Sequence, residues 1–527
     1  MMSAPGPAVW LAATQTVLGE NLWWHRVLHL GLGVATVALL SRMAIEATGA
    51  VTGGVVAALA LGLQPGFVYS TTLPLKTSLV LFLLAAGLDA LLRVLADGKT
   101  ARPGLWLGIA TGCLLGAAVT QLSLLGVPIL LGVLAALGLL PGRRHRAKLA
   151  IALLAIVPLH AIALGLCRHG GASSHLRFWP QSGVHMLIGL GPGATGRYQP
   201  VPGLENSPRG HTFEARLLAE TSVGRVLSPE ASDAWYRVRV AEHLRRHPGE
   251  VGRTLWRKLR LFFADYEPKE NFSIDELRSR SATLRWLPMR WGVLVVLAAA
   301  GGASLAAQRR WAELRMLGGL VGVIVASTLA TFVTTRYRYP AAIPLALLAG
   351  HAVAGFGARR TSVLVAGLIA VPLAFAPVVT REERDAERWR AEGNRRRAET
   401  VPAFLERLGE IRKAPLSESR LEAELAILRS LRRESEAFAV ARRGVAALPT
   451  NRTAAATVLE YLILLGHYEE AEGFVRERVT AERDAAEDLG QLLPAHAGGA
   501  YWRFIYPRLR PAPDNARPEG SEQEAQP

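Results

Sequence analysis

Three basic side chains, Lys76, Arg336 and Arg338, stand beside apolar stretches where a phosphate-bearing lipid could reach them. Lys76 opens an apolar stretch, and a cation there can either neutralise a lipid phosphate or simply extend toward the headgroups. Arg336 and Arg338 lie in the Arg-Tyr-Arg-Tyr-Pro turn at residues 336–340. Arginine binds phosphate or carboxylate through paired hydrogen bonds, so this turn is a candidate anion site, with ordinary headgroup contact as the alternative.

A second group of candidate residues lies in a polar stretch, residues 168–286, which separates two sets of apolar segments. It is far longer than the usual connection between helices, and segments of this length commonly carry function. It is rich in Trp, Tyr, Phe and Arg. Its candidate loop or interface residues are His185, Tyr198, Trp256, Lys258, Tyr266 and Glu267.

Helix signals within this stretch predict how those residues are held. Ser228 followed by Pro229 predicts a helix start, and the His247–Glu250 segment predicts a break and a second start. The apolar face of the second helix carries Leu255, Trp256, Leu259, Phe262 and Phe263. The opposite face carries most of Arg253, Arg257, Lys258 and Arg260. This pattern is typical of a helix in the membrane interface; a core-facing helix of a small soluble domain is the alternative.

The histidines give weaker signals. His25 and His29 are four residues apart and could share a metal on one helix face. They lack the intervening Glu of a metalloprotease motif, so two interfacial histidines are the simpler interpretation. His160 and His351 are lone polar residues in apolar stretches, where an ionisable group is a functional candidate and a packed, satisfied histidine is the alternative.

Two further patterns predict no site. Residues 191–196 match GxGxxG, but a dinucleotide fingerprint needs a preceding strand and a following helix, and neither is evident. We interpret them as a turn-rich loop. The chain's two cysteines, Cys113 and Cys167, both lie in apolar stretches and define neither a disulfide framework nor a metal site.

The apolar stretches themselves predict a membrane protein. Half of the 527 residues are hydrophobic, and crossing an apolar core of about 30 Å takes roughly 20 such residues in a helix. Ten candidate spans cover residues 27–46, 50–69, 77–96, 104–122, 124–140, 148–167, 287–307, 316–335, 338–357 and 361–379. The fourth and fifth form a hairpin, since polar residues interrupt the run at 120–123.

Basic residues predict the orientation of these spans. The net charge of +17 could indicate nucleic-acid binding, but many basic residues flank apolar spans at 143–148, 309–315 and 359–360. Cationic turns usually face the cytosol. On that basis residues 168–286, and everything after 380, lie outside the cytosol. The N-terminus then falls outside too, without a signal sequence to carry it there, which we interpret as at least one missing upstream helix.

The charged C-terminal part shows an internal period. Residues 380–400 predict a solvated linker helix. Beyond them Leu431, Glu436 and Ala437 recur 34 residues later, at 465, 470 and 471. Thirty-four residues is the tetratricopeptide period, and chance recurrence in an Ala/Glu/Arg-rich tail is the alternative. The composition after residue 507 is typical of a disordered end.

Together these patterns predict an all-α polytopic membrane protein of about ten transmembrane helices, with a large extracytoplasmic loop domain and a C-terminal tetratricopeptide-like domain. The expected divisions are N-terminal transmembrane helices, loop domain, C-terminal transmembrane helices, linker helix, helical repeats and tail, at residues 1–167, 168–286, 287–379, 380–400, 401–506 and 507–527.

The chain resembles a known family in several segments. Those segments are Gln64–Tyr69, Leu75–Lys76, Gly224–Pro229, His247–Glu250, Arg257–Leu259, Phe262–Glu267 and Arg336–Pro340. In this order they resemble the bacterial GT-C glycosyltransferases related to dolichyl-phosphate-mannose–protein mannosyltransferases, in the branch with C-terminal tetratricopeptide repeats. The likeness covers roughly residues 5–357.

The resemblance implies transfer of a sugar from a polyprenyl-phosphate donor to a protein or glycan acceptor, in the bacterial inner membrane. Lys76, Arg336 and Arg338 would bind the donor phosphate, and a divalent metal ion is possible as a cofactor. The family's acidic general base lies in a first outside loop that this chain lacks, so its catalytic residue is unknown. Family-typical charged or amide groups are also replaced around Thr77, Gln121 and residues 185–191.

Two other functions remain open on the sequence. A non-catalytic membrane scaffold would keep the fold and hold a protein partner through its repeats, as the missing acidic loop suggests. A transporter is less favoured, because the two sets of spans show no matching pair of broken helices. Membrane lipids are expected partners in every case, and nucleic acid is not.

Overall fold

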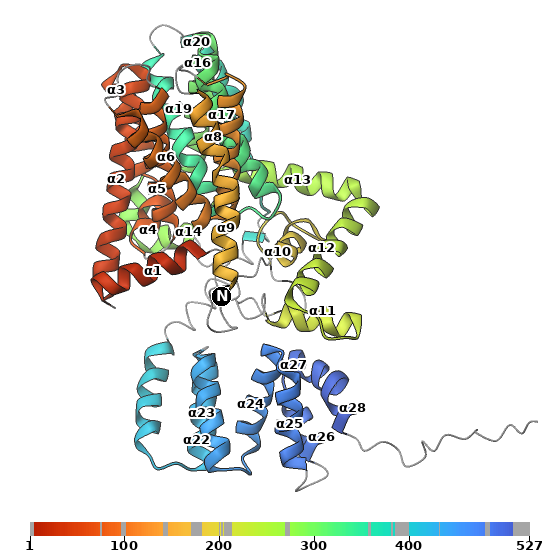
Figure 1. The fold of residues 1–527 in the computed structure, drawn as a ribbon. Helices are drawn as coiled ribbons and strands as arrows, with labels where there is room; N and C mark the ends of the chain where they lie inside the picture. The colour runs from red at the N-terminus through yellow and green to blue at the C-terminus, as the bar shows by residue number, and fades with distance from the viewer. Residues whose placement is uncertain are drawn as a thin grey trace, which may run out of the picture. The chain divides into compact units, whose positions relative to one another are not determined.

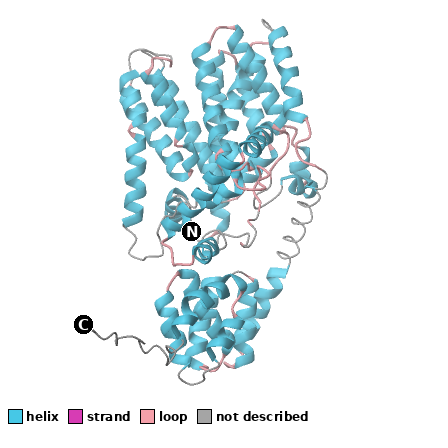
Figure 2. Cartoon of the chain, turned by 90° about the vertical axis from the view of Figure 1, so that its right-hand side faces the viewer, coloured by secondary structure: helices cyan, strands magenta, loops and turns pink. Residues whose placement is uncertain are grey.

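The computed structural model is helical throughout the part of the chain that it describes. Described are residues 5–19, 21–73, 76–95, 102–140, 146–169, 182–199, 201, 204, 213–268, 274–356, 360–380, 383–384, 400–431, 433–479 and 485–509. Within these ranges there is no β-strand, and the only extended pairing is an isolated bridge between Arg197 and Val333. The prediction of an all-α fold is confirmed for these residues (Figures 1 and 2).

The chain divides into two compact units. The first combines Met1–Gln199 with Tyr236–Glu392, and the second combines Pro200–Trp235 with Gly393–Pro527. Both boundaries of the inserted piece fall inside the polar stretch, and one falls inside the helix α12 (Pro229–Arg246). The stretch thus contributes residues to each unit.

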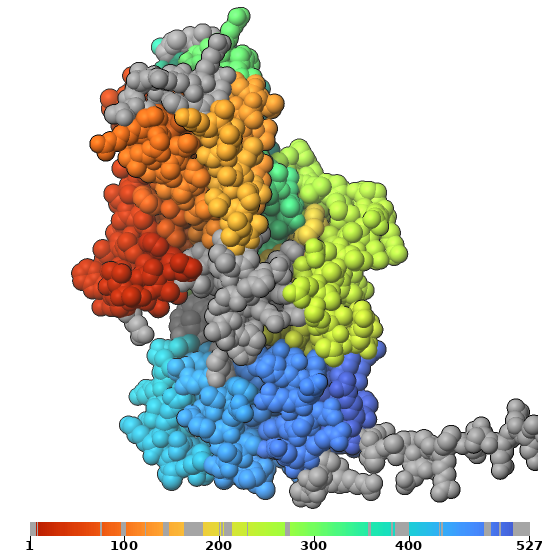
Figure 3. Space-filling model, viewed as in Figure 1, coloured from red at the N-terminus to blue at the C-terminus, as the bar shows by residue number. Residues whose placement is uncertain are grey.

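The first unit is a helical bundle. Its helices are α1 (Pro5–Leu18), α2 (Leu22–Thr48), α3 (Val51–Gly62), α4 (Pro65–Thr71), α5 (Lys76–Leu95), α6 (Pro103–Thr120), α7 (Gly126–Ala136), α8 (Arg146–Leu154), α9 (Ile156–His169), α10 (Ser182–Leu190), α13 (Pro248–Phe263), α14 (Ile274–Arg280), α15 (Ala282–Trp286), α16 (Trp291–Ala307), α17 (Trp311–Leu329), α18 (Thr335–Arg338), α19 (Ala342–Ala354) and α20 (Arg360–Phe375). A short turn, η4 (Tyr339–Ala341), joins α18 to α19. On the face shown in Figure 3, α8 and α9 pack against α6 and α7.

Five helices among the described residues are long and apolar enough to cross a membrane. They are Leu22–Thr48, Lys76–Leu95, Pro103–Thr120, Ala282–Ala307 (α15 continued by α16) and Trp311–Leu329. The predicted span at 50–69 is instead two helices, α3 and α4, bent by 70° at a break before Pro65. The pair would make a sixth span. Ten spans therefore stay a prediction.

Helix α19 shows why a long apolar run need not give a long span. The predicted span at 338–357 begins with the α18–η4 turn, so only 13 residues form α19, about 20 Å at 1.5 Å per residue. That helix is buried from Ala342 to Ala352. A Cβ added at Gly301 of α16 would stand 1.7 Å from the Leu348 carbonyl oxygen, so glycine permits this close helix approach.

The second unit contains paired helices at a constant period. α22 (Glu418–Ser430) and α24 (Arg452–Leu465) begin 34 residues apart, as do α23 (Glu434–Ala447) and α25 (Tyr468–Val479). The caps repeat too: the Ser417 and Asn451 side chains accept from the N–H groups of Arg420 and Ala454. Other described helices of this unit are residues 400–413, α26 (Ala485–Leu492), α27 (Ala495–Ala500), the π-helix η5 (Tyr501–Ile505) and α28 (Tyr506–Leu509), together with α11 (Ala215–Val223) from the polar stretch.

Candidate functional site

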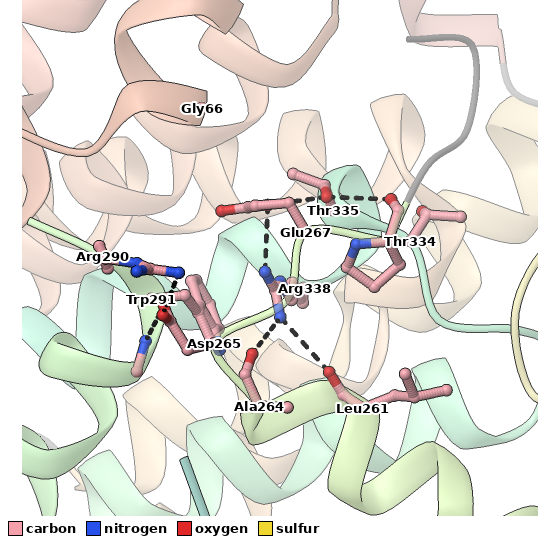
Figure 4. Close-up of polar contacts among 12 residues, drawn as sticks. Gly66, Leu261, Ala264, Asp265, Glu267, Arg290, Trp291, Thr334, Thr335 and Arg338 are labelled. Atoms are coloured by element: carbon pink, nitrogen blue, oxygen red, sulfur yellow. Dashed lines mark hydrogen bonds and ion pairs between the residues drawn. The ribbon is translucent and has the colours of Figure 1, made fainter. Parts of the chain in front are cut away.

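Arg338 is completely buried in the first unit and tied to the end of α13. Its Nη1 donates to the carbonyl oxygens of Leu261, Phe262 and Ala264 at 3.4, 3.4 and 3.1 Å. Its guanidinium carbon lies 4.4 Å from the centre of the Trp291 ring, a cation–π contact. Figure 4 shows the contacts of this side chain with Leu261 and Ala264 and the nearby Trp291. Arg338 therefore joins the 336–340 turn to the segment after α13.

Glu267 is the carboxylate partner of Arg338. Its Oε2 lies 3.0 Å from Nη2 of Arg338 and accepts a hydrogen bond of 2.8 Å from Oγ1 of Thr335 (Figure 4). The side chain is 16% exposed, and among the described residues no contact reaches its Oε1. One oxygen is therefore held by a hydrogen bond from Thr335 and by the ion pair with Arg338, and the other remains available for a proton or a ligand hydroxyl.

A second ion pair borders the first. Asp265 accepts from the N–H of Gly292 at 3.0 Å and pairs with Nη2 of Arg290 at 2.6 Å. Trp291, the residue between them, donates from Nε1 to the Phe262 carbonyl oxygen at 2.8 Å. These contacts fasten the start of α16 to the end of α13. Residues 261–267, 290–292 and 334–338 thus form one polar cluster, which we call the Arg338 cluster.

Asp275, in the first turn of α14, adds a carboxylate to the surroundings of the Arg338 cluster. It keeps access to solvent, while the crowding of protein around it and the negative charge of Glu267 raise the pKa of its carboxyl group. Arg278 and Arg290 oppose that shift.

Lys258 lies on the buried face of α13, contrary to the prediction that placed it with the exposed cations. Its Nζ donates to the carbonyl oxygens of Leu329 and Thr331 at 2.7 and 2.5 Å, just where α17 ends. Those carbonyls have no partner within the helix, so the lysine caps them. Trp256, expected on the apolar face that meets the membrane interface, is 59% exposed. The prediction for Lys258 was wrong because the carbonyl oxygens at the end of α17 accept hydrogen bonds from its ammonium group. These bonds offset the cost of burying the polar side chain.

Residues 191–196 form the turn-rich loop that their composition predicted, and Gly196 of this loop and Gly189 near the end of α10 lie against Lys258. A Cβ at Gly189 would stand 1.6 Å from the Thr331 carbonyl oxygen. A Cβ at Gly196, where φ is +81°, would stand 2.9 Å from Cγ of Lys258. The loop therefore wraps a buried lysine.

Burial lowers the pKa of Lys258 to about 7, against about 10.4 in an unfolded chain. Because the folded chain then binds the proton more weakly, we expect the free energy of unfolding to rise as the pH rises from about 7 to about 10. Lys258→Met should remove this rise and lower stability at every pH, since two carbonyls lose their donor. Thermal unfolding of both proteins at several pH values would measure it; equal pH slopes would contradict the assignment.

Arg197, which follows Gly196, contacts Tyr266. Nη1 of Arg197 donates to the Tyr266 hydroxyl at 3.1 Å, and its Nη2 lies 3.1 Å from Oε1 of Glu383. Arg257 contacts the same carboxylate oxygen at 2.5 Å. Both arginines therefore bind the segment that follows α20.

An aromatic group surrounds Phe332. The rings of His185, Tyr198 and Tyr337 lie 5.7, 5.2 and 5.7 Å from that of Phe332. Arg336 is half-buried, with its guanidinium carbon 5.8 Å from the Tyr337 ring. Lys76 is also half-buried and begins α5. Of the three predicted phosphate-binding cations, Lys76 and Arg336 thus keep some exposure, whereas Arg338 is engaged inside the protein.

The histidines have separate surroundings. His25 contacts the Gly19 carbonyl oxygen at 2.9 Å, whereas His29 contacts Oγ of Ser78 and accepts from Nε1 of Trp10 at 3.4 Å. His351 lies 3.7 Å from Glu313, and both ring nitrogens of His160 are buried without a hydrogen-bond partner among the described residues. Within those residues no group of three His, Cys, Asp or Glu could hold a metal ion.

Sequence reasoning missed Asp265, Asp275, Arg290 and Glu383 as parts of this region. Of these four residues, only Glu383 could have been predicted to have a structural role. The segment Thr380-Arg381-Glu382-Glu383 has the spacing of a helix capping box. Comparison of the chain with protein-family models, curated proteins and solved structures finds no match.

Proposed function

We propose that this chain is a GT-C type membrane glycosyltransferase, which moves a sugar from a polyprenyl-phosphate donor to an extracytoplasmic protein or glycan. The observation that carries the proposal is the Arg338–Glu267 pair. It joins two of the segments through which the chain resembles that family, Phe262–Glu267 and Arg336–Pro340. It also leaves one carboxylate oxygen of Glu267 without a contact among the described residues.

Glu267 is the residue we assign as general base. Its Oε1 would take the proton of the acceptor hydroxyl as the acceptor oxygen bonds to the anomeric carbon. The bond between that carbon and the phosphate oxygen breaks, and the phosphate leaves with the electron pair. Lys76 and Arg336 would stabilise the charge that develops on it. Thr335 and Arg338 hold Glu267 in place.

The second unit supports the proposed location. Helix α11 comes from the polar stretch and α22–α28 from the C-terminal part, yet they form one compact unit and so share a side of the membrane. With the cationic turns in the cytosol, that side is the outer one. The 34-residue helix pairs fit tetratricopeptide-like repeats, which would position an acceptor or another protein.

Glu267→Gln is expected to lower sugar transfer by about 10²–10⁴-fold, because glutamine keeps the shape but accepts no proton. The assay is transfer from labelled polyprenyl-phosphate hexoses in membranes containing the full chain. Glu276→Gln is the matched control, since it removes one charge from an i, i+4 pair with Arg280 on α14. Wild-type levels of transfer in Glu267→Gln would remove Glu267 from this role, and no transfer by the wild-type chain would refute the function.

A membrane scaffold is the second candidate, favoured by the engagement of Arg338 inside the protein rather than at a surface. Arg336→Ala distinguishes the two functions. If it abolishes a cellular glycan at normal protein levels, the scaffold is excluded. If the glycan persists while a partner captured by the repeats is lost, the scaffold is favoured.

A further inference from the structure

Two arginines from different segments converge on a single carboxylate oxygen. Arg257 of α13 and Arg197 of the loop after α10 place Nη2 atoms 2.5 and 3.1 Å from Oε1 of Glu383. The Arg197 side chain is 9% exposed and that of Arg257 32% exposed. One arginine is thus fixed within the protein, and the other reaches the surface. We call the two the Arg197–Arg257 clamp.

Glu383 also forms hydrogen bonds with Thr380 that do not involve the two arginines of the clamp. The N–H of Thr380 donates to its Oε2 at 3.0 Å, and its own N–H donates to Oγ1 of Thr380 at 3.2 Å. This is a capping box, in which the two residues satisfy each other's backbone donors. Because Oε2 serves the cap and Oε1 fills the clamp, Oε1 can be displaced while the local turn stays formed.

The clamp lies on a helix suited to the membrane surface. Apart from the buried Lys258, α13 (Pro248–Phe263) carries three cations, Arg253, Arg257 and Arg260, and one acid, Glu250. Trp256, next to Arg257, is 59% exposed. Exposed tryptophan is typical of the headgroup level, and arginines at that level meet lipid phosphates.

We propose that the Arg197–Arg257 clamp binds the phosphate of a membrane lipid, and that Glu383 occupies the clamp when no lipid is bound. Guanidinium groups bind carboxylate and phosphate by the same paired hydrogen bonds, and phosphate offers more oxygens and more charge. The inference does not require glycosyl transfer. A polyprenyl phosphate would be one ligand of this class.

Opposite effects of two substitutions test the proposal. The measurement is binding of phosphatidic acid to the purified full-length chain in uncharged detergent, by native mass spectrometry. Arg257→Gln should weaken binding about tenfold, and Glu383→Gln should strengthen it by about the same factor, because a competing anion is removed. Arg257→Lys should fall between, since lysine keeps the charge without the planar fork. Arg253→Gln, an exposed position on the same helix, is the matched control.

A purely structural ion pair gives a different pattern. It predicts that Glu383→Gln leaves lipid binding unchanged or weaker, and either result would overturn the proposal. Equal effects of Arg253→Gln and Arg257→Gln would also overturn it, because they would show general attraction to charge. Binding of inorganic phosphate, measured in the same way, tests whether the ligand is a soluble phosphate. If it binds as tightly as phosphatidic acid, the ligand is a soluble phosphate and not a lipid.

Discussion

Replacing Arg338 with methionine is expected to lower the free energy of unfolding by about 3–5 kcal/mol, as loss of one partner of a buried ion pair usually does. Arg338 is fully buried, so Glu267 would keep a charge without its counter-ion. Three carbonyl oxygens at the end of α13 would lose a donor at the same time. Thermal or denaturant unfolding of the full-length chain in detergent, followed by tryptophan fluorescence, would measure the loss.

A double-mutant cycle separates the ion pair from the packing of Arg338. Glu267→Gln removes the charge, so Arg338→Met should cost less in that background, with a coupling energy between about 0.5 and 3 kcal/mol. Arg338→Lys tests the shape of the group: it keeps the charge but cannot reach three carbonyls and stack on Trp291 at once. Full stability of Arg338→Met would show that the cluster does not hold α13 to the 336–340 turn.

Local helix signals were predictable from the sequence because they depend on neighbouring residues. The Ser228 hydroxyl accepts from the N–H of Ala231, and α13 begins at Pro248, as the cap and proline patterns indicated. The 34-residue recurrence likewise reappears in the starts of α22 and α24. In each case a short pattern determines a backbone geometry directly.

Contacts between distant segments were not predictable in this way. A helical pattern places Lys258 among cations, but its partner carbonyl on Leu329 lies 71 residues away in the sequence. The break before Pro65 and the short length of α19 were not predicted, because an apolar run shows only composition. It does not show where a helix bends or ends. Composition alone also made residues 168–286 look like one domain, whereas these residues belong to two compact units.

Replacing Glu220 is expected to have the largest effect on the stability of the second unit. It is fully buried on α11, where Oε2 accepts from the Tyr468 hydroxyl at 2.5 Å and Oε1 accepts from the N–H of Leu227 at 3.1 Å. Arg216, one turn earlier, lies 3.5 Å from it and donates to the carbonyls of residues 463–465 that end α24. Glu220 thus holds both α11 and the arginine that caps the repeat helix.

Glu220→Ala should therefore lower the free energy of unfolding by about 3–5 kcal/mol, because two buried donors lose their acceptor and the half-buried Arg216 loses its carboxylate partner. Hydrogen exchange of the full-length chain should show faster exchange in α11 and in the last turn of α24. Tyr468→Phe should cost less, about 1–3 kcal/mol, since it removes one hydrogen bond and leaves the Arg216 pair. Glu469→Ala, at an exposed position on the same helix as Tyr468, is the matched control. Unchanged exchange at the end of α24 in Glu220→Ala would mean that α11 does not stabilise the repeats.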